Sequence, residues 1–210
     1  MMNIDVAGQV GAIVREIQSR QHEGREARVV IATRSYDTDI ADLWEAITSA
    51  ERIPRWFLPV TGELRLGGRY QLQGNAGGTI TGCEPPRRLD VTWEFGGGVS
   101  WVSVSLTEDA AGGTRLELEH MAHVEAHWEQ FGPGAVGIGW DLTLMGLGRH
   151  LATGAAVDPK EGMAWTVTDQ GKAFMRASGE GWLAADIAMG TDPEVARGAS
   201  DRTIAAYTGG

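Results

Sequence analysis

Cysteine is almost missing from this chain of 210 residues, in which Cys83 stands alone. A single thiol excludes an internal disulfide and a cysteine-based metal cluster, and it fits a reducing compartment. No uninterrupted run of roughly 18 apolar residues occurs, so no membrane-spanning helix is expected. Residues 1–21 also lack the apolar run of a signal peptide. We therefore expect a cytoplasmic protein.

Positive charge is scarce as well. The chain has 18 Lys and Arg against 28 Asp and Glu, which gives a formal net charge of −10 at pH 7. Binding to a nucleic-acid backbone needs clustered Lys and Arg, and an anionic membrane surface attracts basic segments. We therefore expect neither a nucleic-acid partner nor a membrane partner.

Recognisable catalytic and cofactor-binding motifs are absent from the sequence. It contains no Gly-x-Ser-x-Gly nucleophile elbow. The glycines of residues 74–78 stand between two strand-like runs, which is typical of a hairpin turn and not of a phosphate-binding loop. Cys83 has no basic neighbour in sequence, so we expect an inert thiol. No cofactor is expected.

Glycine, in contrast, is abundant at 30 residues, and it separates short apolar runs. This pattern is typical of a sheet-rich protein with tight turns. Between residues 61 and 126 it predicts six strands, at 62–66, 69–74, 78–83, 89–95, 99–106 and 114–124. Short connections favour antiparallel pairing, and an antiparallel sheet commonly has one dry face that needs a cover.

Helical and extended segments precede these strands. We predict a short helix at the N-terminus and then a hairpin over residues 12–35 with its turn at Glu23-Gly24. Thr38 is predicted to cap the next helix. The apolar face of that helix carries Ile40, Leu43, Trp44 and Ile47. A second short helix is predicted over residues 50–57, ended by Pro59.

A long helix is predicted after Pro133, as the cover of the dry face. Its apolar stripe consists of Val136, Trp140, Thr143, Leu144, Leu147 and Leu151. The helix is also rich in glycine, which costs about 1 kcal/mol of helix stability per residue. We therefore expect it to pack closely against a sheet or a ligand.

The C-terminal part changes character. Residues 155–161 are predicted to be a linker, followed by a helix over 169–188 that stops at Gly190. Thr191 is predicted to cap a last helix, which runs to about Tyr207. Phe174, Met175, Trp182 and Ile187 give this part more apolar surface than a free tail should show. We expect them to dock on their own body or on a second copy, which would make a homodimer.

Several segments of residues 27–153, in this order and spacing, resemble a known family. They are Asp42-Leu43-Trp44-Glu45-Ala46-Ile47, Pro54-Arg55-Trp56-Phe57, Gly67-Gly68-Arg69-Tyr70, Gly82 with Glu84-Pro85-Pro86-Arg87-Arg88-Leu89, Thr92-Trp93, Thr114-Arg115-Leu116-Glu117-Leu118-Glu119-His120 and Gly139-Trp140. The chain resembles the START/SRPBCC superfamily, in the branch of homologues of the activator of the heat-shock-protein ATPase.

The resemblance implies an α+β helix-grip fold, in which a curved antiparallel sheet wraps around a long C-terminal helix and leaves an internal cavity. Members of the superfamily mostly bind small hydrophobic molecules. The predicted organisation is an N-terminal extension over 1–26, a START-like domain over 27–153 and a C-terminal helical extension over 154–210. The resemblance is to a fold and a branch, and it assigns neither an activity nor a chaperone role.

The strand over residues 114–124 predicts one buried polar residue. His120 shares a face with Leu116 and Leu118, whereas Glu117 and Glu119 point the other way. A buried imidazole needs a hydrogen-bond partner. His120 is therefore a candidate ligand contact and the one candidate catalytic acid or base, and the alternative is a core histidine bonded to a neighbouring strand.

Aromatic and apolar residues complete the predicted ligand-binding set. We expect the ligand to contact Trp56, Tyr70, Trp93, His120, Trp140 and Leu144. Each aromatic residue has a structural alternative, which is packing in the core.

Histidines at 120, 123 and 127 raise the question of a metal site. In a strand, His120 and His123 point to opposite faces and cannot share an ion. We expect His123 and His127 to be solvated loop residues and no metal to bind. The acidic pairs Asp37/Asp39 and Glu117/Glu119 are predicted to be solvated as well.

Three functions remain open from the sequence. The first is binding of a small hydrophobic molecule in an internal cavity. The second is an enzyme of the cyclase, aromatase or hydrolase type that uses the same cavity, with His120 moving a proton. The third is a co-chaperone or another protein-interaction module, which the C-terminal helices suggest.

Overall fold

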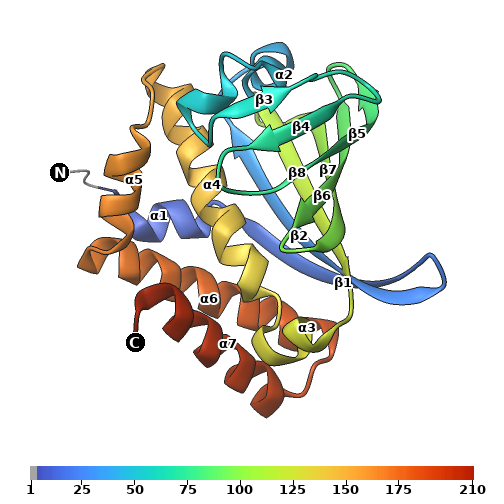
Figure 1. Ribbon diagram of the computed structural model, residues 1–210. Helices are drawn as coiled ribbons and strands as arrows, with labels where there is room; N and C mark the ends of the chain where they lie inside the picture. Colours follow the sequence, from blue (N-terminus) through green and yellow to red (C-terminus); the bar gives the residue numbers. More distant parts are fainter. Residues whose placement is uncertain (1–3) are drawn as a thin grey trace. The chain divides into compact units, whose positions relative to one another are not determined.

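The computed structural model describes residues 4–210, and it begins with a short helix followed by a two-stranded hairpin (Figure 1). Helix α1 spans Val6–Gly11, and strands β1 and β2 span Val14–His22 and Arg25–Tyr36. Glu23 and Gly24 both have positive φ in the turn, as a tight hairpin turn requires. The predicted helix, hairpin and turn are confirmed; residues 1–3 of the predicted N-terminal extension lie outside the described residues.

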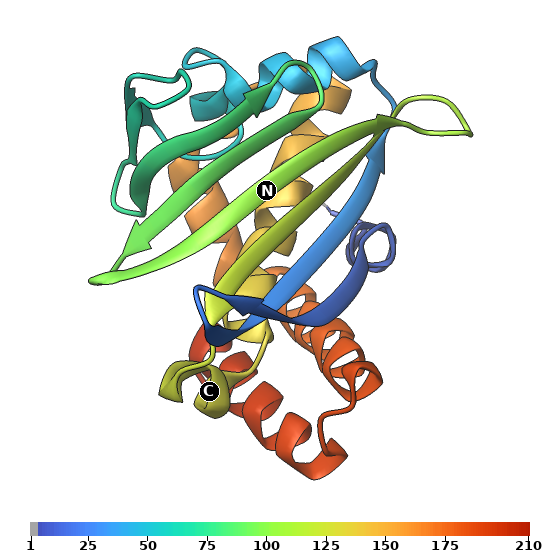
Figure 2. The same ribbon diagram turned by 90° about the vertical axis from the view of Figure 1, so that its right-hand side faces the viewer.

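Six further strands complete an eight-stranded sheet with the order β1-β2-β8-β7-β6-β5-β4-β3. They are β3 (Val60–Gly62), β4 (Arg69–Leu72), β5 (Gly77–Glu84), β6 (Arg88–Phe95), β7 (Gly98–Glu108) and β8 (Thr114–His123). The neighbours from β3 to β8 pair antiparallel, and Figure 2 shows the curvature of their strands. The predicted α+β class with a curved antiparallel sheet is confirmed.

The first of the six strands predicted for residues 61–126 is misplaced in sequence. The strand lies at Val60–Gly62 and not at 62–66. Gly62 has a φ of +110°, and residues 63–68 then fold into a turn in which the amide of Gly68 donates to the carbonyl of Arg65. The alternation of Leu64 and Leu66 with charged residues in this turn is the pattern that predicted a strand.

The helices after β2 also differ in detail from the prediction. Helix α2 spans Ile40–Thr48, and its cap is Asp39, whose side chain accepts from the amide of Asp42. Thr38, the predicted cap, instead donates its hydroxyl to the Asp42 side chain. The helix predicted over 50–57 is only a single 3₁₀ turn, η1 (Ile53–Arg55), because the backbone leaves helical geometry at Trp56.

Five helices follow the sheet. They are α3 (Ala126–Phe131), α4 (Gly134–Thr153), α5 (Pro159–Thr166), α6 (Asp169–Met189) and α7 (Pro193–Thr208). The long helix after Pro133 and the stop at Gly190 are confirmed. The cap of α7 is Asp192 and not Thr191, since the Asp192 side chain accepts from the first free amides. Among residues 4–210, no helix is long and apolar enough to cross a membrane.

Two of these helices were not predicted. Helix α3 lies where a loop with His127 was expected, and it ends at Gly132, whose φ is +62°. Helix α5 begins inside the predicted linker over 155–161.

The chain divides into two compact units. The first combines the N-terminal residues through Ala32 with His123–Leu142 and Lys160–Gly210. The second consists of Thr33–Ala122 and Thr143–Pro159. Strands β2 and β8 and helices α4 and α5 therefore contribute residues to both units.

In the first unit, helices α6 and α7 lie side by side (Figure 1) and enclose apolar side chains. Phe174 and Trp182 are fully buried, and Met175 is almost so. These three side chains dock on their own unit, which is the first of the two predicted alternatives. Ile187 remains 38% exposed. Dimerisation through these helices stays a prediction.

The glycines of α4 pack against neighbours, as their number in the sequence predicts. A Cβ atom added at Gly137 would overlap the indole of Trp182 in the first unit. In the second unit, a Cβ at Gly146 would lie 2.9 Å from the carbonyl oxygen of Trp56, and one at Gly148 would lie 2.9 Å from Nη2 of Arg34. The cost of glycine in a helix is thus offset by close packing.

Candidate functional site

The candidate site lies in the second unit, on one face of strands β6, β7 and β8. Partners across antiparallel strands share a face. One row of partners is Val91, Val102 and His120, and the next is Leu89, Val104 and Leu118. Trp93 and Ser100 form the row beyond His120. Apart from His120 and Ser100, these three rows are apolar.

His120 is 6% exposed, as the strand periodicity predicts. Its Nε2 lies 2.8 Å from Oγ of Ser100, and its ring centroid lies 6.1 Å from that of Trp93. The Ser100 hydroxyl donates to the carbonyl oxygen of Trp93 at 3.2 Å. The single Ser100 proton is within reach of both Nε2 of His120 and the carbonyl oxygen of Trp93, so it is used inside the protein with either tautomer of His120. The partner on a neighbouring strand is the one the core alternative predicted.

Burial lowers the pKa of His120 to about 4. Desolvation is the cause, because a protonated imidazole loses its hydration inside an apolar face. At pH 7 the ring is therefore neutral. His120 acts here as a hydrogen-bonding group and not as a cation.

The face is less completely covered towards β6. Val102, Leu118 and His120 are buried, whereas Trp93 and Val104 are only half-buried although they share the face. Leu89 and Val91 of β6 are half-buried as well. Apolar side chains around the His120–Ser100 pair thus remain partly in contact with solvent.

Tyr70 belongs to an apolar cluster with Ile53, Leu72 and Ile80, against which Trp93 also packs. Its hydroxyl donates to the carbonyl oxygen of Thr92 at 2.8 Å, and burial raises the pKa of the phenol. The structure therefore brings Tyr70, Trp93 and His120 into one neighbourhood.

The other predicted contacts have structural tasks of their own. Nε1 of Trp56 donates to the carbonyl oxygen of Ala46 at 2.9 Å, and its ring stacks on Phe57 at 5.6 Å. Leu144 is 2% exposed, and its carbonyl oxygen accepts from the hydroxyl of Tyr36 at 3.0 Å.

Trp140 lies on α4 within the first unit, where it is buried. That Trp140 contacts the same ligand as the residues of the second unit stays a prediction.

Ser100 was missed by the sequence analysis. The signal was available, because Ser100 has the same strand parity as Val102, Val104 and Leu106. Ser103 has the opposite parity, lies on the other face of β7 and donates to Asp90.

His123 and His127 differ from the prediction of solvated loop residues. His123 is the last residue of β8 and half-buried, and its Nε2 lies 3.2 Å from the carbonyl oxygen of His22. His127 is exposed but belongs to α3, with its ring 5.0 Å from that of Phe131. Across residues 4–210, no three His, Cys, Asp or Glu side chains are grouped to hold a metal ion.

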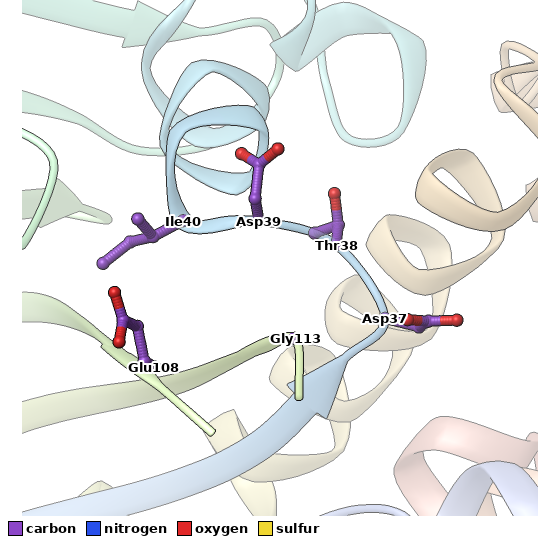
Figure 3. A pocket seen from close by; sticks show the side chains of 6 residues that line it. All are labelled: Asp37, Thr38, Asp39, Ile40, Glu108 and Gly113. Atoms are coloured by element: carbon purple, nitrogen blue, oxygen red, sulfur yellow. The ribbon is translucent and has the colours of Figure 1, made fainter. Parts of the chain in front are cut away.

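A hollow of about 370 Å³ lies elsewhere in the second unit, at the start of α2 (Figure 3). It is lined by Asp37, Thr38, Asp39, Ile40, Glu108 and Gly113. The Glu108 side chain points towards Ile40, whereas Asp37 points away, and Asp39 is used as the cap of α2. The three carboxylates do not converge on one point. Asp37 and Asp39 are exposed, as predicted.

Comparisons with known proteins place this geometry in a family. Residues 37–152 match the family described as Activator of Hsp90 ATPase homolog 1-like protein. The crystal structure of CalU16 from Micromonospora echinospora is 38% identical, with a TM-score of 0.67, over 83% of this chain and 98% of that one. Its solution structure is 33% identical, with a TM-score of 0.68, over 85% and 97%.

A more distant structure, MLL2253 from Mesorhizobium loti, has the same fold at 21% identity and a TM-score of 0.54, over 60% of this chain and 97% of that one. The comparison with curated proteins found no match. The similarity to CalU16 covers a larger share of the chain than residues 37–152 do. The chain thus has the predicted helix-grip fold, and it belongs to the family of Activator of Hsp90 ATPase homolog 1-like proteins within the START/SRPBCC superfamily.

Proposed function

We propose that this protein binds a small hydrophobic molecule in an internal cavity, against the β6–β8 face around His120. The observation that carries the proposal is the contact between buried His120 and half-buried Ser100 within an otherwise apolar face. Such sites in proteins are mostly apolar and hold a few placed polar groups that orient the ligand.

The polar pair has a cost that an apolar core would avoid. Burying a polar group costs free energy, and its hydrogen bond recovers only part of it. A leucine at position 120 would continue the apolar face of β8 after Leu116 and Leu118 and would avoid this cost. A hydrogen bond to a ligand would explain why a polar pair occupies this face. The half-buried Trp93 and Val104 beside it support the same proposal, since a ligand would cover them.

Binding is favoured over catalysis by the state of the histidine. General-base catalysis works best when the pKa lies near the working pH, and burial lowers the pKa of His120 to about 4. A cyclase-, aromatase- or hydrolase-like enzyme is therefore the second candidate. A co-chaperone role would rest on the family description alone.

The test is titration with a neutral apolar fluorophore, N-phenyl-1-naphthylamine, together with the shift of the melting temperature. We expect saturable binding and a higher melting temperature, because a ligand of the native state stabilises it. Ser100→Ala is expected to weaken binding. Ser103→Ala, on the opposite face of β7, is the matched control and is expected to leave binding unchanged.

Two results would argue against the proposal. One is the absence of saturable binding together with an unchanged melting temperature. The other is equal loss of binding in both serine variants, which would separate binding from the β6–β8 face.

A further inference from the structure

We infer that the bound molecule is uncharged and carries a hydrogen-bond donor, such as a hydroxyl or an amide N–H, that binds to Oγ of Ser100. The site would thus discriminate against a carboxylate of the same shape. This inference rests on the proposed function and narrows its ligand class.

The directions of the hydrogen bonds carry the first step. Oγ of Ser100 lies 2.8 Å from Nε2 of His120 and 3.2 Å from the carbonyl oxygen of Trp93, so its one proton is used within the protein with either tautomer of His120. A serine oxygen has two acceptor positions, and at most one of them receives a bond from His120. What Ser100 offers a ligand is therefore an acceptor. A ligand group must bring the proton.

The charge of the face carries the second step. Over residues 89–93, 100–106 and 116–120, every side chain that β6, β7 and β8 direct to this face is uncharged. They are Leu89, Val91 and Trp93 of β6, Ser100, Val102, Val104 and Leu106 of β7, and Leu116, Leu118 and His120 of β8. The charged residues of these strands alternate onto the other face. There Arg88 pairs with Asp90 at 2.8 Å, and Glu94 pairs with Arg69 at 2.7 Å.

A carboxylate would meet two penalties on this face. It has no proton to donate to Ser100, and its oxygens would face the lone pair of Oγ. Its charge would also lose hydration among apolar side chains without a cation to pair with, and an uncompensated buried charge is costly. Burial holds His120 neutral at pH 7, which removes the one cation this face could form.

The second unit also holds a buried arginine, which could pair with an acidic ligand. Arg34 of β2 is 8% exposed, and its guanidinium carbon lies 5.2 Å from the ring centroid of Tyr36. It also packs against Gly148 of α4. If the ligand were an acid, Arg34 would be the residue to bind it. The test therefore includes this residue.

Three naphthalene probes of nearly equal shape separate the possibilities by calorimetry at pH 7. They are 2-naphthol, which is neutral and a donor, 2-methoxynaphthalene, which is neutral without a donor, and 2-naphthoate, which is an anion. We expect 2-naphthol to bind about 2- to 10-fold more tightly than the methoxy compound, the range for one net hydrogen bond. We expect 2-naphthoate to bind at least about tenfold more weakly than 2-naphthol.

Variants assign the effect to residues. Ser100→Ala should abolish the advantage of 2-naphthol over the methoxy compound, and Ser103→Ala should keep it. Melting temperatures of both variants show that the fold is intact. Arg34→Gln should leave the order of the three probes unchanged.

Each contrary result has a distinct meaning. Equal or tighter binding of 2-naphthoate would overturn the inference and leave the proposed function standing, and its loss in Arg34→Gln would place the acid at Arg34. Equal binding of 2-naphthol and the methoxy compound would overturn the donor requirement. Failure of all three probes to bind would contradict the proposed function itself, and the inference with it.

Discussion

At the residue scale, the first unit is organised around a carboxylate without contact to solvent. Asp141 of α4 is 0% exposed, and its Oδ2 accepts from Nε of Arg15 at 2.9 Å, Oγ of Ser178 at 2.5 Å and Nε1 of Trp182 at 3.2 Å. Burial raises the pKa of Asp141, and the positive charge of Arg15 opposes this shift. The guanidinium also donates to the carbonyl oxygen of Ile13. One ion pair thus ties the N-terminal segment to α4 and α6.

Removal of the cation from this pair is expected to be strongly destabilising. Arg15→Met leaves a buried carboxylate without its partner, which costs about 3–5 kcal/mol of unfolding free energy. Arg25→Met is the matched control, because Arg25 and Glu125 form an exposed pair worth about 1 kcal/mol or less. Urea unfolding of the three proteins measures the difference. Equal losses in both variants would contradict the account.

Stability should also depend on pH through His120. The pKa of this group is about 4 in the folded protein and about 6.5 in the unfolded chain, so the unfolded chain binds more protons between these values. The contribution is fully present above pH 6.5 and is lost as pH falls towards 4. It amounts to about 3 kcal/mol, from 1.36 kcal/mol per pKa unit.

The carboxylates of the chain titrate in the same pH range, so the comparison is made with His120→Leu. The wild type should lose about 3 kcal/mol of unfolding free energy relative to His120→Leu as pH falls from 7 to 4. A difference that does not change with pH would show that His120 is not buried in a neutral form.

At the element scale, α4 depends on glycine where another helix approaches it. Gly137→Ala is expected to lower the stability by about 1–3 kcal/mol, because its Cβ would overlap Trp182 and force the helices apart. Gly139→Ala is the control. Its Cβ would lie 3.4 Å from the hydroxyl of Tyr207, and alanine gains up to about 1 kcal/mol of helix propensity. In thermal unfolding, the melting temperature should fall in Gly137→Ala and rise in Gly139→Ala. Equal destabilisation of the two variants would refute the packing argument.

The sequence predicted elements well where periodicity was long. The strand around Leu116 and Leu118 alternates cleanly between apolar and charged residues, and its predicted range, 114–124, matches β8 within one residue. Elements of a single turn or two were missed, because α3 and α5 are too short to show a repeat. The false strand at 62–66 arose because Leu64 and Leu66 alternate with charged residues over five positions, as residues of a strand do.

Contacts between distant segments could not be predicted. The partnership of Ser100 with His120 depends on the register of β7 against β8, which the alternation of one strand alone does not determine. The same holds for Arg15 and Asp141, which are 126 residues apart. His120 was predicted as a buried polar residue, and only the register identified its partner.

At the scale of the whole molecule, the family assignment and the relative CalU16 support one architecture that includes residues outside 37–152. The C-terminal helices bury Phe174, Met175 and Trp182 within the first unit. A homodimer through these helices would therefore have to use other side chains, such as Ile187 and Val195, which remain exposed.

The homodimer prediction can be tested with those side chains. If the C-terminal helices pair two copies, light scattering should give a dimer mass for the wild type and a monomer mass for Ile187→Asp combined with Val195→Asp. An unchanged mass in the double variant would exclude this face.

The central claim is that the His120–Ser100 pair contacts a bound neutral molecule. It is tested most directly by nitrogen-detected NMR of imidazole-labelled protein during titration with 2-naphthol. We expect the His120 ring to be neutral. We also expect its resonances and the amide resonance of Ser100 to shift saturably, while the amide resonance of Ser103 stays unchanged. Saturable shifts that leave His120 and Ser100 unaffected, or a His120 ring that is charged at pH 7, would contradict the account.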